Sequence, residues 1–350
     1  MADNFNSLLA RDFLAQSGVS ERLNRDGVTE VAINRPFEIW TESAVGWVQE
    51  SLPALDYDLC WKLANSLSTY NHRFLSIQSP IKTVELPDGE RGQIVIPPAC
   101  EAGTISMTFR KPSLERFRLE DYASSGRFEK MQKRRRCQHA LQPFEVELKQ
   151  LLAEHDCVAF FKKAVQHKLN IIIFGGTGSG KTTFAKAVVD LFPHDRRMLT
   201  IEELNELKLP YHPNHVHLLY GDTVSPKELV SCCMRMKGDH IFLAELTGDE
   251  AWDFMELLNT GHPGTITTAH ANDSLSGYAR VCGLIKQAPI GLGLDYAYIE
   301  RRVRTSFDAV MYMEGTHILE VAYEPEIKQA LLNGGSLSSS LHERSLLCGK

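Results

Sequence analysis

Residues 170–192 read NIIIFGGTGSGKTTFAKAVVDLF, and they carry the strongest indication of the fold. Ile171 to Phe174 form a short apolar run before glycines, which is typical of a strand in a parallel sheet that is covered on both faces. Residues Thr182 to Leu191 predict a helix that ends before Pro193. A buried strand, a glycine-rich turn and a helix in this order predict one unit of an α/β domain.

The turn itself carries the pattern G-x-x-x-x-G-K-T. Glycines let such a loop curl until its N–H groups point at phosphate oxygens, and the start of the next helix adds positive potential. Lys181 would then reach the β- and γ-phosphates, and the hydroxyl of Thr182 would ligate Mg²⁺. We prefer this interpretation to a glycine-rich turn without a ligand, and we expect ATP and Mg²⁺ as cofactors. The predicted nucleotide-binding residues of the loop are Gly175, Gly176, Thr177, Gly178, Ser179, Gly180, Lys181, Thr182 and Thr183.

The composition excludes several classes of protein. The length of 350 residues favours two domains, and 43% hydrophobic with 23% charged residues is ordinary for a soluble globular protein. A net charge of −6 provides no global basic field, so we expect no direct sequence-specific binding of nucleic acid. The eight cysteines include no C-x-x-C pair, which argues against a zinc ribbon or a disulfide framework and fits a reducing cytosol.

The hydropathy pattern contains no run that approaches the 18 or more apolar residues of a membrane span. The first residues, MADNFNSLLARDFL, lack the pattern of a cleavable signal. We therefore expect a cytoplasmic protein whose contact with a membrane is peripheral. The basic segment GRFEKMQKRRRCQH, residues 126–139, is either a solvated connector or a strip that contacts anionic lipid or nucleotide phosphate.

The strand and helix patterns predict an α/β protein with two domains. Before residue 120, strand-like segments surround one amphipathic helix candidate, YDLCWKLANSLSTY, as in a small α+β domain. From Pro143 onward strands and helices alternate, as in a doubly wound, RecA-like P-loop domain. SPKE at 225–228 and TGDE at 247–250 predict two helix starts by capping boxes. The predicted parts are 1–125 (α+β domain), 126–145 (basic linker), 146–333 (ATPase domain) and 334–350 (flexible Gly/Ser-rich tail).

Acidic residues follow two of the predicted strands. HIFLAEL, residues 240–246, presents Glu245 at a strand end, with Ala244 where P-loop enzymes usually carry a metal-binding aspartate. Glu245 is therefore predicted to polarise the attacking water, although a strand-end acid on the surface has the same pattern. Glu202 and Glu203 could hold Mg²⁺ through water in place of the missing aspartate, with Glu203 as the metal ligand. The alternative for this pair is a solvated helix start.

A histidine follows a third strand candidate, TITTA. His270 would point towards the edge of the sheet at which ligands bind, although a lone histidine is usually structural.

The ordered segments GGTGSGKTT, TIEEL, CCMRMKGDHIFLAELTGDEAWDFMELLNTGHPG and TITTAHAND resemble the secretion or traffic ATPases. Within that superfamily the chain is similar to the hexameric ring ATPase of bacterial type IV secretion systems, which serve conjugation and effector export. The resemblance covers residues 27 to 320, including LPDGERGQIVIPP and TFRKPS. Relatives that drive type II secretion often carry a four-cysteine zinc insertion, which this chain lacks.

The resemblance implies roles for individual residues. Lys181 and Thr182 match the phosphate and metal ligands, Glu245 matches the catalytic glutamate, and His270 matches a histidine thought to sense the γ-phosphate. Glu202 and Glu203 stand where the family has Glu-Asp, which leaves the metal geometry open. The complete set of predicted catalytic residues is Glu245, Lys181, His270, Glu202 and Glu203.

The resemblance also implies that two arginines bind nucleotide from outside the loop. Arg110, in TFRKPS, matches a first-domain arginine that closes over the nucleotide, and Arg127 is our choice for the arginine that the family has in its linker. Arg235 and Lys237 are candidates to face phosphate or a neighbouring subunit.

The implied function is ATP hydrolysis by a homohexamer that powers assembly of, and export through, a type IV secretion system at the bacterial inner membrane. Other secretion components would be its partners there. One alternative is a non-hydrolysing, nucleotide-gated scaffold, but a scaffold needs no base such as Glu245. Another is a DNA-translocating ATPase, which would need a basic pore with aromatic residues for stacking, and the net charge counts against it.

Overall fold

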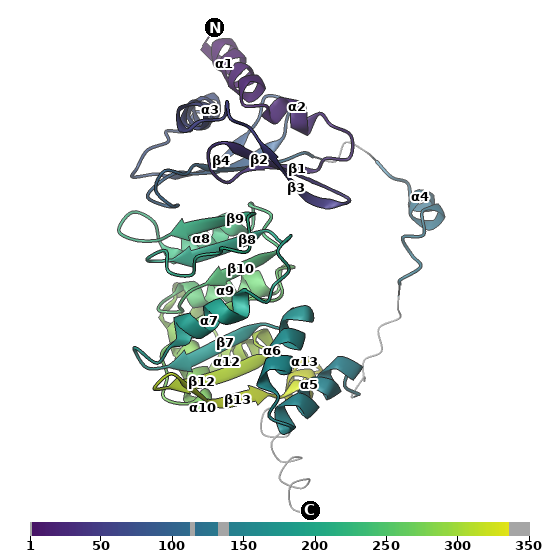
Figure 1. Ribbon diagram of the computed structural model, residues 1–350, viewed down its shortest axis with the longest axis vertical. Coiled ribbons are helices and arrows are strands. Elements are labelled where there is room, and N and C mark those ends of the chain that lie inside the picture. Colours follow the sequence, from purple (N-terminus) through teal and green to yellow (C-terminus); the bar gives the residue numbers. More distant parts are fainter. Residues whose placement is uncertain (1, 113–115, 132–139, 336–350) are drawn as a thin grey trace, which may run out of the picture.

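The computed structural model describes residues 2–112, 116–131 and 140–335, which form two bodies joined by an outlying connector (Figure 1). In the first body, six antiparallel strands pair in the order β3-β2-β1-β6-β5-β4. Their bounds are β1 Glu30–Ile33, β2 Glu38–Ser43, β3 Gly46–Ser51, β4 Ile81–Glu85, β5 Arg91–Val95 and β6 Ser106–Arg110. The helices α1 Ala2–Gln16, α2 Val19–Leu23 and α3 Tyr57–Tyr70 lie above this sheet.

The alternation of side chains along the strands decides which face of this sheet is apolar. Met107 and Phe109 of β6 belong to the core shared with α1, α2 and α3, whereas Thr108 between them faces the second body. Helix α3 has the bounds that the sequence predicted, and Asp56 caps its start by accepting from the backbone N–H of Leu59 at 2.8 Å. One face of the sheet is therefore left to bind the second body.

The second body is built on seven strands. Their bounds are β7 Ile171–Gly175, β8 Met198–Glu202, β9 His215–Leu219, β10 His240–Leu243, β11 Ile266–Ala269, β12 Ala309–Glu314 and β13 His317–Tyr323. Hydrogen-bonded ladders join them in two groups, β10-β8-β9 and β11-β7-β12-β13, and all pairs are parallel except the β12–β13 hairpin. Since β10 and β11 lie side by side, the groups form one twisted sheet.

Helices cover both faces of this sheet, which explains the continuous apolar run of β7. Ile172 and Phe174 point into one core with α8, α9, α10 and α12, while Ile171 and Ile173 point into another with α5, α6 and α7. The α/β fold class predicted from the sequence is confirmed. The helices are α5 Pro143–Ala153, α6 Cys157–Gln166, α7 Lys181–Val189, α8 Pro226–Cys233, α9 Glu250–Leu258, α10 Ser274–Gln287, α11 Pro289–Leu292, α12 Tyr296–Ser306 and α13 Pro325–Leu332.

One of the two predicted capping boxes forms as expected. The hydroxyl of Ser225 accepts from the backbone N–H of Glu228 at the start of α8, and the Glu228 carboxylate accepts from the backbone N–H of Ser225. In the second box the Glu250 carboxylate accepts from the backbone N–H of Thr247, as expected, but it also accepts from the N–H of Gly248 and holds this segment as a turn. Helix α9 therefore begins at Glu250, two residues later than a box capped by Thr247 predicts.

Arg197 joins the two bodies and was not predicted from the sequence. Its side chain is fully buried and donates to Asn34 at 2.7 Å, Asn214 at 2.6 Å and Thr108 at 3.1 Å, while its Nε donates to the carbonyl of Met236. A backbone bond from Leu219 to Ala99 adds a segment of the first body to the free edge of β9. The first body thus contacts β8 and β9.

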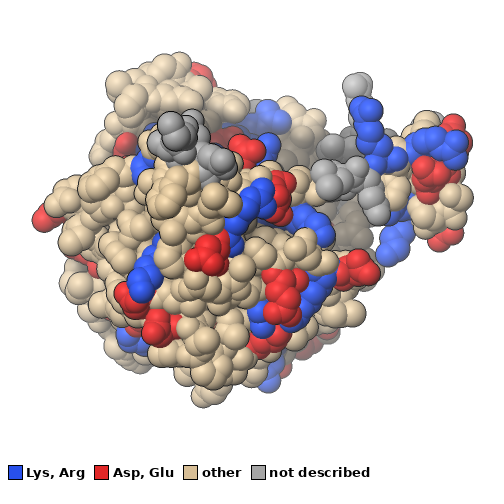
Figure 2. All heavy atoms as spheres, turned by 90° about the horizontal axis from the view of Figure 1, so that it is seen from above, with Lys and Arg blue, Asp and Glu red and all other residues tan. Residues whose placement is uncertain are grey.

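The connector runs outside both bodies. Its helix α4, Leu119–Ser124, lies to one side in Figure 1 and forms a separate charged projection when seen from above in Figure 2. The predicted linker, residues 126–145, begins after α4 and includes the start of α5. Its most basic part, residues 133–136, and the predicted tail from residue 336 onward lie outside the described residues, and the domain boundaries stay predictions. In the described chain, the helices are all too short or too polar to span a bilayer.

Candidate nucleotide-binding site

The phosphate-binding loop joins the carboxyl end of β7 to the start of α7. Gly180 has a φ of 87°, a left-handed conformation that favours glycine, and α7 begins directly after it at Lys181. The Lys181 ammonium donates to the carbonyls of Gly175 at 2.9 Å and Gly176 at 2.8 Å. Burial lowers the pKa of Lys181, and the nearby Glu245 opposes that shift. The lysine is therefore already held inside the loop.

The carboxyl ends of four strands bring most of the predicted residues together. A cavity of about 350 Å³ is bounded by the loop on one side and by the ends of β8, β10 and β11 on the other. The predicted residues that line it are Thr177, Gly178, Lys181, Thr182, Glu202, Glu203, Glu245 and His270. Residues that are far apart in the sequence thus share one edge of the sheet, as their positions after strands predicted.

Glu245 and His270 make a direct contact in this cavity. Oε1 of Glu245 lies 2.8 Å from Nε2 of His270, and the side chains are 31% and 46% exposed. Both are thus accessible to a ligand or a water molecule. A carboxylate held by an imidazole, in the cavity that the phosphate-binding lysine also lines, is suited to orienting a water and accepting its proton.

The two adjacent glutamates differ in their surroundings. Glu202 is buried, and its Oε2 accepts from the backbone N–H groups of Glu206 at 2.9 Å and Leu207 at 2.8 Å. Burial raises the pKa of Glu202, but His217 and these backbone donors outweigh that effect, so the net shift is downward. Glu203 is exposed at the cavity wall. Glu202 therefore fixes the loop after β8, while Glu203 faces the ligand space.

Three further residues at the site were missed in the sequence. His217 on β9 places its Nδ1 3.5 Å from Glu202 and 2.8 Å from the hydroxyl of Thr200. Tyr220 lines the cavity, where burial and the nearby carboxylates, Glu203 first among them, raise its pKa to about 12. Thr268 lines the cavity within the segment TITTAHAND, so its place in that motif was the available signal.

The two predicted arginines lie away from this cavity. Arg110 is 72% exposed, with its Nε 3.5 Å from Glu30, in a separate interdomain cavity of about 1040 Å³ that Lys237 also lines. Since Lys237 precedes β10, this is the amino edge of the sheet, opposite the phosphate-binding loop. Arg127 stacks on Phe117, with its guanidinium carbon 4.5 Å from the ring centroid, in the outlying connector.

The oxygen donors at the site suit Mg²⁺. Thr182 offers a hydroxyl, and Glu203 and Glu245 offer carboxylates that line the same cavity. In the part of the chain that the structure describes, no cluster of three or more His, Cys, Asp and Glu side chains is arranged to hold a metal by itself. Mg²⁺ keeps several waters and is usually held by one or two protein groups plus phosphates, so a sparse oxygen set fits it.

Comparisons with known proteins agree with this geometry. Residues 129–311 match the family described as Type II/IV secretion system protein. The type IV secretion system protein VirB11 of Brucella suis is 41% identical over 319 residues, which cover 87% of this chain and 88% of the relative. The type IV secretion system protein PtlH of Bordetella pertussis is 34% identical over 311 residues, which cover 83% of this chain and 87% of the relative.

A solved structure supports the assignment over nearly the whole chain. The crystal structure of the VirB11 ATPase from the Brucella suis type IV secretion system, in complex with sulphate, has a TM-score of 0.89 at 40% identity. The match covers 95% of this chain and 99% of that one. The chain therefore belongs to the type II/IV secretion system protein family and, within it, to the VirB11-type ATPases of type IV secretion systems.

Proposed function

We propose that this chain hydrolyses ATP in a Mg²⁺-dependent reaction, and that the cycle of binding and hydrolysis drives assembly of, and export through, a type IV secretion system. The observation that supports this best is the contact between His270 and Glu245, at 2.8 Å, in the cavity that Lys181 also lines. A binding site alone would need the loop but not a positioned base. The pair therefore favours turnover over a nucleotide-gated scaffold.

Each residue of the site has a distinct part in the proposed reaction. Lys181 exchanges the carbonyls of Gly175 and Gly176 for phosphate oxygens when ATP enters. Glu245 orients the attacking water and accepts its proton, and His270 holds the carboxylate in place.

The proposed metal would be held by few protein groups. The hydroxyl of Thr182 would bind it directly, and Glu203 would do so through water. When bound, Mg²⁺ would neutralise the charge that develops on the β- and γ-oxygens. Glu202 fixes the backbone of the loop that follows Glu203 by accepting from the N–H groups of Glu206 and Leu207.

We also propose a homohexamer, and the position of Arg110 supports contacts between subunits. Arg110 lies at the amino edge of the sheet, whereas Lys181 lies at the carboxyl edge. One nucleotide cannot touch both in this conformation. If Arg110 contacts phosphate, that phosphate belongs to a neighbouring subunit whose carboxyl edge faces it. Closure would then depend on nucleotide, because the contact exists only while phosphate is bound.

The proposed location is the cytoplasmic face of the inner membrane, where the protein would bind other secretion components peripherally. Release from membranes by high salt would support this, because electrostatic attraction to anionic lipid is screened within a Debye length. Retention through salt and carbonate washes would contradict it.

The proposed activity is tested by comparing ATP hydrolysis and mass by light scattering, with and without Mg²⁺, for the wild type and Lys181→Ala. We expect turnover only with Mg²⁺, and neither turnover nor ATP-dependent thermal stabilisation in Lys181→Ala. Lys186→Ala, on the same helix but outside the cavity, serves as the matched control and should retain turnover. If ATP raised the Tm of Lys181→Ala as much as it raises the Tm of the wild type, this result would contradict the assignment of the site.

A further inference from the structure

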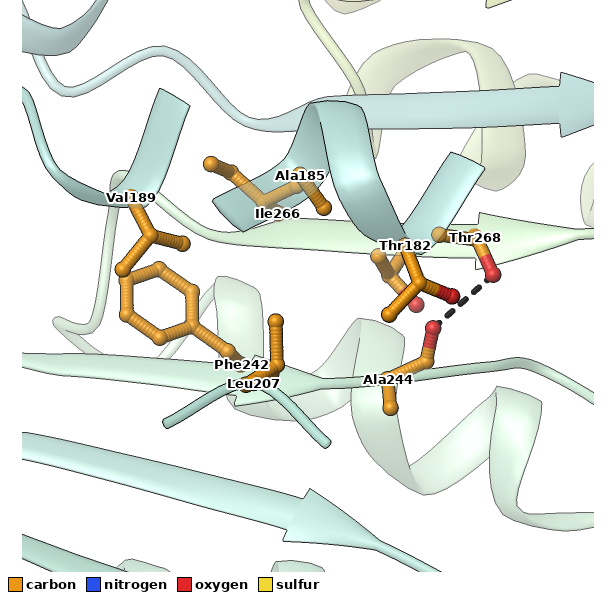
Figure 3. A pocket seen from close by; sticks show the side chains of 9 residues that line it. Thr182, Ala185, Val189, Leu207, Phe242, Ala244, Ile266 and Thr268 are labelled. Carbon is orange, nitrogen blue, oxygen red and sulfur yellow. Dashed lines mark hydrogen bonds between the residues drawn. The ribbon is translucent and has the colours of Figure 1, made fainter. Parts of the chain in front are cut away.

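The sheet of the second body contains a seam between β10 and β11. Backbone ladders hold β10 with β8 and β9, and β11 with β7, β12 and β13. Across the seam, the hydroxyl of Thr265 donates to the carbonyl of Ile241 at 2.5 Å, and the hydroxyl of Thr268 donates to the carbonyl of Ala244 at 2.9 Å. Hydrogen bonds from side chains thus take the place of part of the backbone ladder between β10 and β11, as Figure 3 shows for Thr268 and Ala244.

The seam also divides the candidate active site. Lys181 and His270 follow β7 and β11 on one side, whereas Glu203 and Glu245 follow β8 and β10 on the other. The distance between the phosphate-binding loop and the proposed base therefore depends on the bonds that cross the seam.

Packing is incomplete at one place in this seam. A cavity of about 10 Å³ lies in the seam beneath α7, lined by apolar groups such as Ala185, Val189 and Phe242. Thr182 and Thr268 lie together at one end of it, and Val189 and Phe242 lie at the other (Figure 3). A void leaves its lining without contacts on one side. The hydrogen bonds of Thr268 therefore hold the end of the seam that is nearest to the nucleotide.

Thr268 holds the backbone on both sides of Glu245. Its hydroxyl donates to the carbonyl of Ala244, the preceding residue, and its own carbonyl accepts from the N–H of Leu246, the following residue, at 2.8 Å. Thr268 is only 4% exposed, so water does not compete for these bonds. His270, two residues further along the same strand end, holds the carboxylate itself.

The geometry points to Thr268 as a positioning residue that sets the place of Glu245 relative to the phosphate-binding loop. This inference rests on the proposed function, in which Glu245 orients the attacking water. Thr268 acts on the reaction only through Glu245, and it does not affect how tightly ATP binds. If Thr268 merely stabilised the sheet, its replacement would lower Tm and leave kcat unchanged.

The test compares Thr268→Val, which keeps the shape and removes the hydroxyl, with Thr268→Ser, which keeps the hydroxyl. Thr265→Val is the matched control, because it removes the other seam hydroxyl at a position that does not line the nucleotide cavity. For Thr268→Val we expect kcat to fall about ten- to a hundredfold, with KM and ATP-dependent stabilisation unchanged, since small misplacements of reacting groups cost rates of this order. Thr268→Ser should keep most of the turnover, and Thr265→Val should lower Tm without lowering kcat.

A double mutant tests whether the effect passes through Glu245. In single-turnover measurements, Thr268→Val should lower the rate of hydrolysis when Glu245 is present but cause no further loss when it is added to Glu245→Gln. The effects of two substitutions on the rate are not additive when one residue acts through the other. An additive loss, an unchanged kcat in Thr268→Val, or an equal loss in Thr265→Val would overturn the inference. If Thr268→Val does not fold, Thr268→Ala is compared with Thr268→Ser in its place. Unchanged turnover in Glu245→Gln alone would instead refute the role given to Glu245 in the proposed function, and this outcome is distinct from those that overturn the inference about Thr268.

Discussion

Nε2 of His270 and Oε1 of Glu245 lie 2.8 Å apart, although the two residues follow strands on opposite sides of the seam. The contact therefore joins the half of the sheet that carries the phosphate-binding loop to the half that carries the acidic residues. His270 and Thr177 of the loop line the same cavity, so a nucleotide bound there lies beside this pair. This is a physical route by which the site could respond to the γ-phosphate.

Replacing His270 should separate binding from turnover. His270→Ala removes the group that holds Glu245, so we expect kcat to fall roughly tenfold or more while ATP affinity changes little. His270→Gln can still donate a hydrogen bond and should retain more activity than His270→Ala. Steady-state kinetics on the three proteins measure this, and equal activity in all of them would exclude the positioning role.

The stability of the first body should depend on pH through Glu30. Burial raises the pKa of Glu30 from 4.5 to about 7, an effect that Arg110 partly opposes and Glu42 reinforces. The folded state thus binds a proton that the unfolded state releases between these values, and stability falls as pH rises through this range. Glu30→Gln should be more stable than the wild type at pH 8, by about 1–3 kcal/mol, and the difference should vanish only below about pH 4, where Glu30 is protonated in the folded and the unfolded state.

Chemical denaturation at several pH values measures this difference. Glu85→Gln, measured in the same way, is the control, because it also removes one carboxylate from the lining of the interdomain cavity. A difference that stays constant with pH would show that Glu30 does not titrate in this range.

Arg197 should hold the two bodies together as one cooperative unit. Arg197→Met leaves the buried amide oxygen of Asn34 and the hydroxyl of Thr108 without the guanidinium donor, and Asn214 keeps only its bond from Asn34, so we expect a loss of about 3 kcal/mol or more. Calorimetry should show the single transition split into two. Its neighbour Arg196 is partly exposed, and Arg196→Met should change stability by less than about 0.5 kcal/mol. Identical unfolding transitions in Arg197→Met and Arg196→Met would show that Arg197 does not hold the two bodies together.

Mixing two impaired variants, at an ATP concentration too low to saturate Arg110→Ala, tests how Arg110 acts. Arg110→Ala should weaken ATP binding about ten- to a hundredfold, since a charge-assisted contact is lost. Because Arg110 lies opposite the loop of its own chain, subunits of Arg110→Ala and Lys181→Ala should complement each other in mixed rings. Lys181→Ala supplies the arginine and Arg110→Ala supplies the intact loop. Mixtures with no more activity than either variant alone would rule out contact between subunits, and equal ATP affinities of Arg110→Ala and the wild type would rule out any contact with phosphate.

The local parts of this structure could be predicted because each depends on neighbouring residues. The β7–α7 turn follows from glycine spacing, α3 from its apolar periodicity, and the α8 start from Ser225 with Glu228. Parallel strands end at one edge of a sheet, so the meeting of Glu245 and His270 could also be anticipated.

Other parts depend on contacts between distant segments, which single-sequence patterns do not encode. The start of α9 shifted because Glu250 bonds the turn before the helix. Arg197 appears in the sequence as an ordinary surface arginine, yet it is buried by residues more than 80 positions away. The bond of Thr268 across the seam depends on β10 lying beside β11, and the sequence around Thr268 does not indicate which strand is its neighbour.

In the proposed reaction Glu245 acts on the attacking water, and a single-turnover experiment on Glu245→Gln measures that role by itself. The amide keeps the shape of the side chain and loses its basicity, so labelled ATP should bind with wild-type affinity and be hydrolysed at least about a hundredfold more slowly. Glu203→Gln, measured in parallel, should slow the reaction less and shift its dependence on Mg²⁺ concentration. Hydrolysis by Glu245→Gln at the wild-type rate would contradict this role of Glu245 and transfer it to Glu203, the neighbouring carboxylate that faces the ligand space.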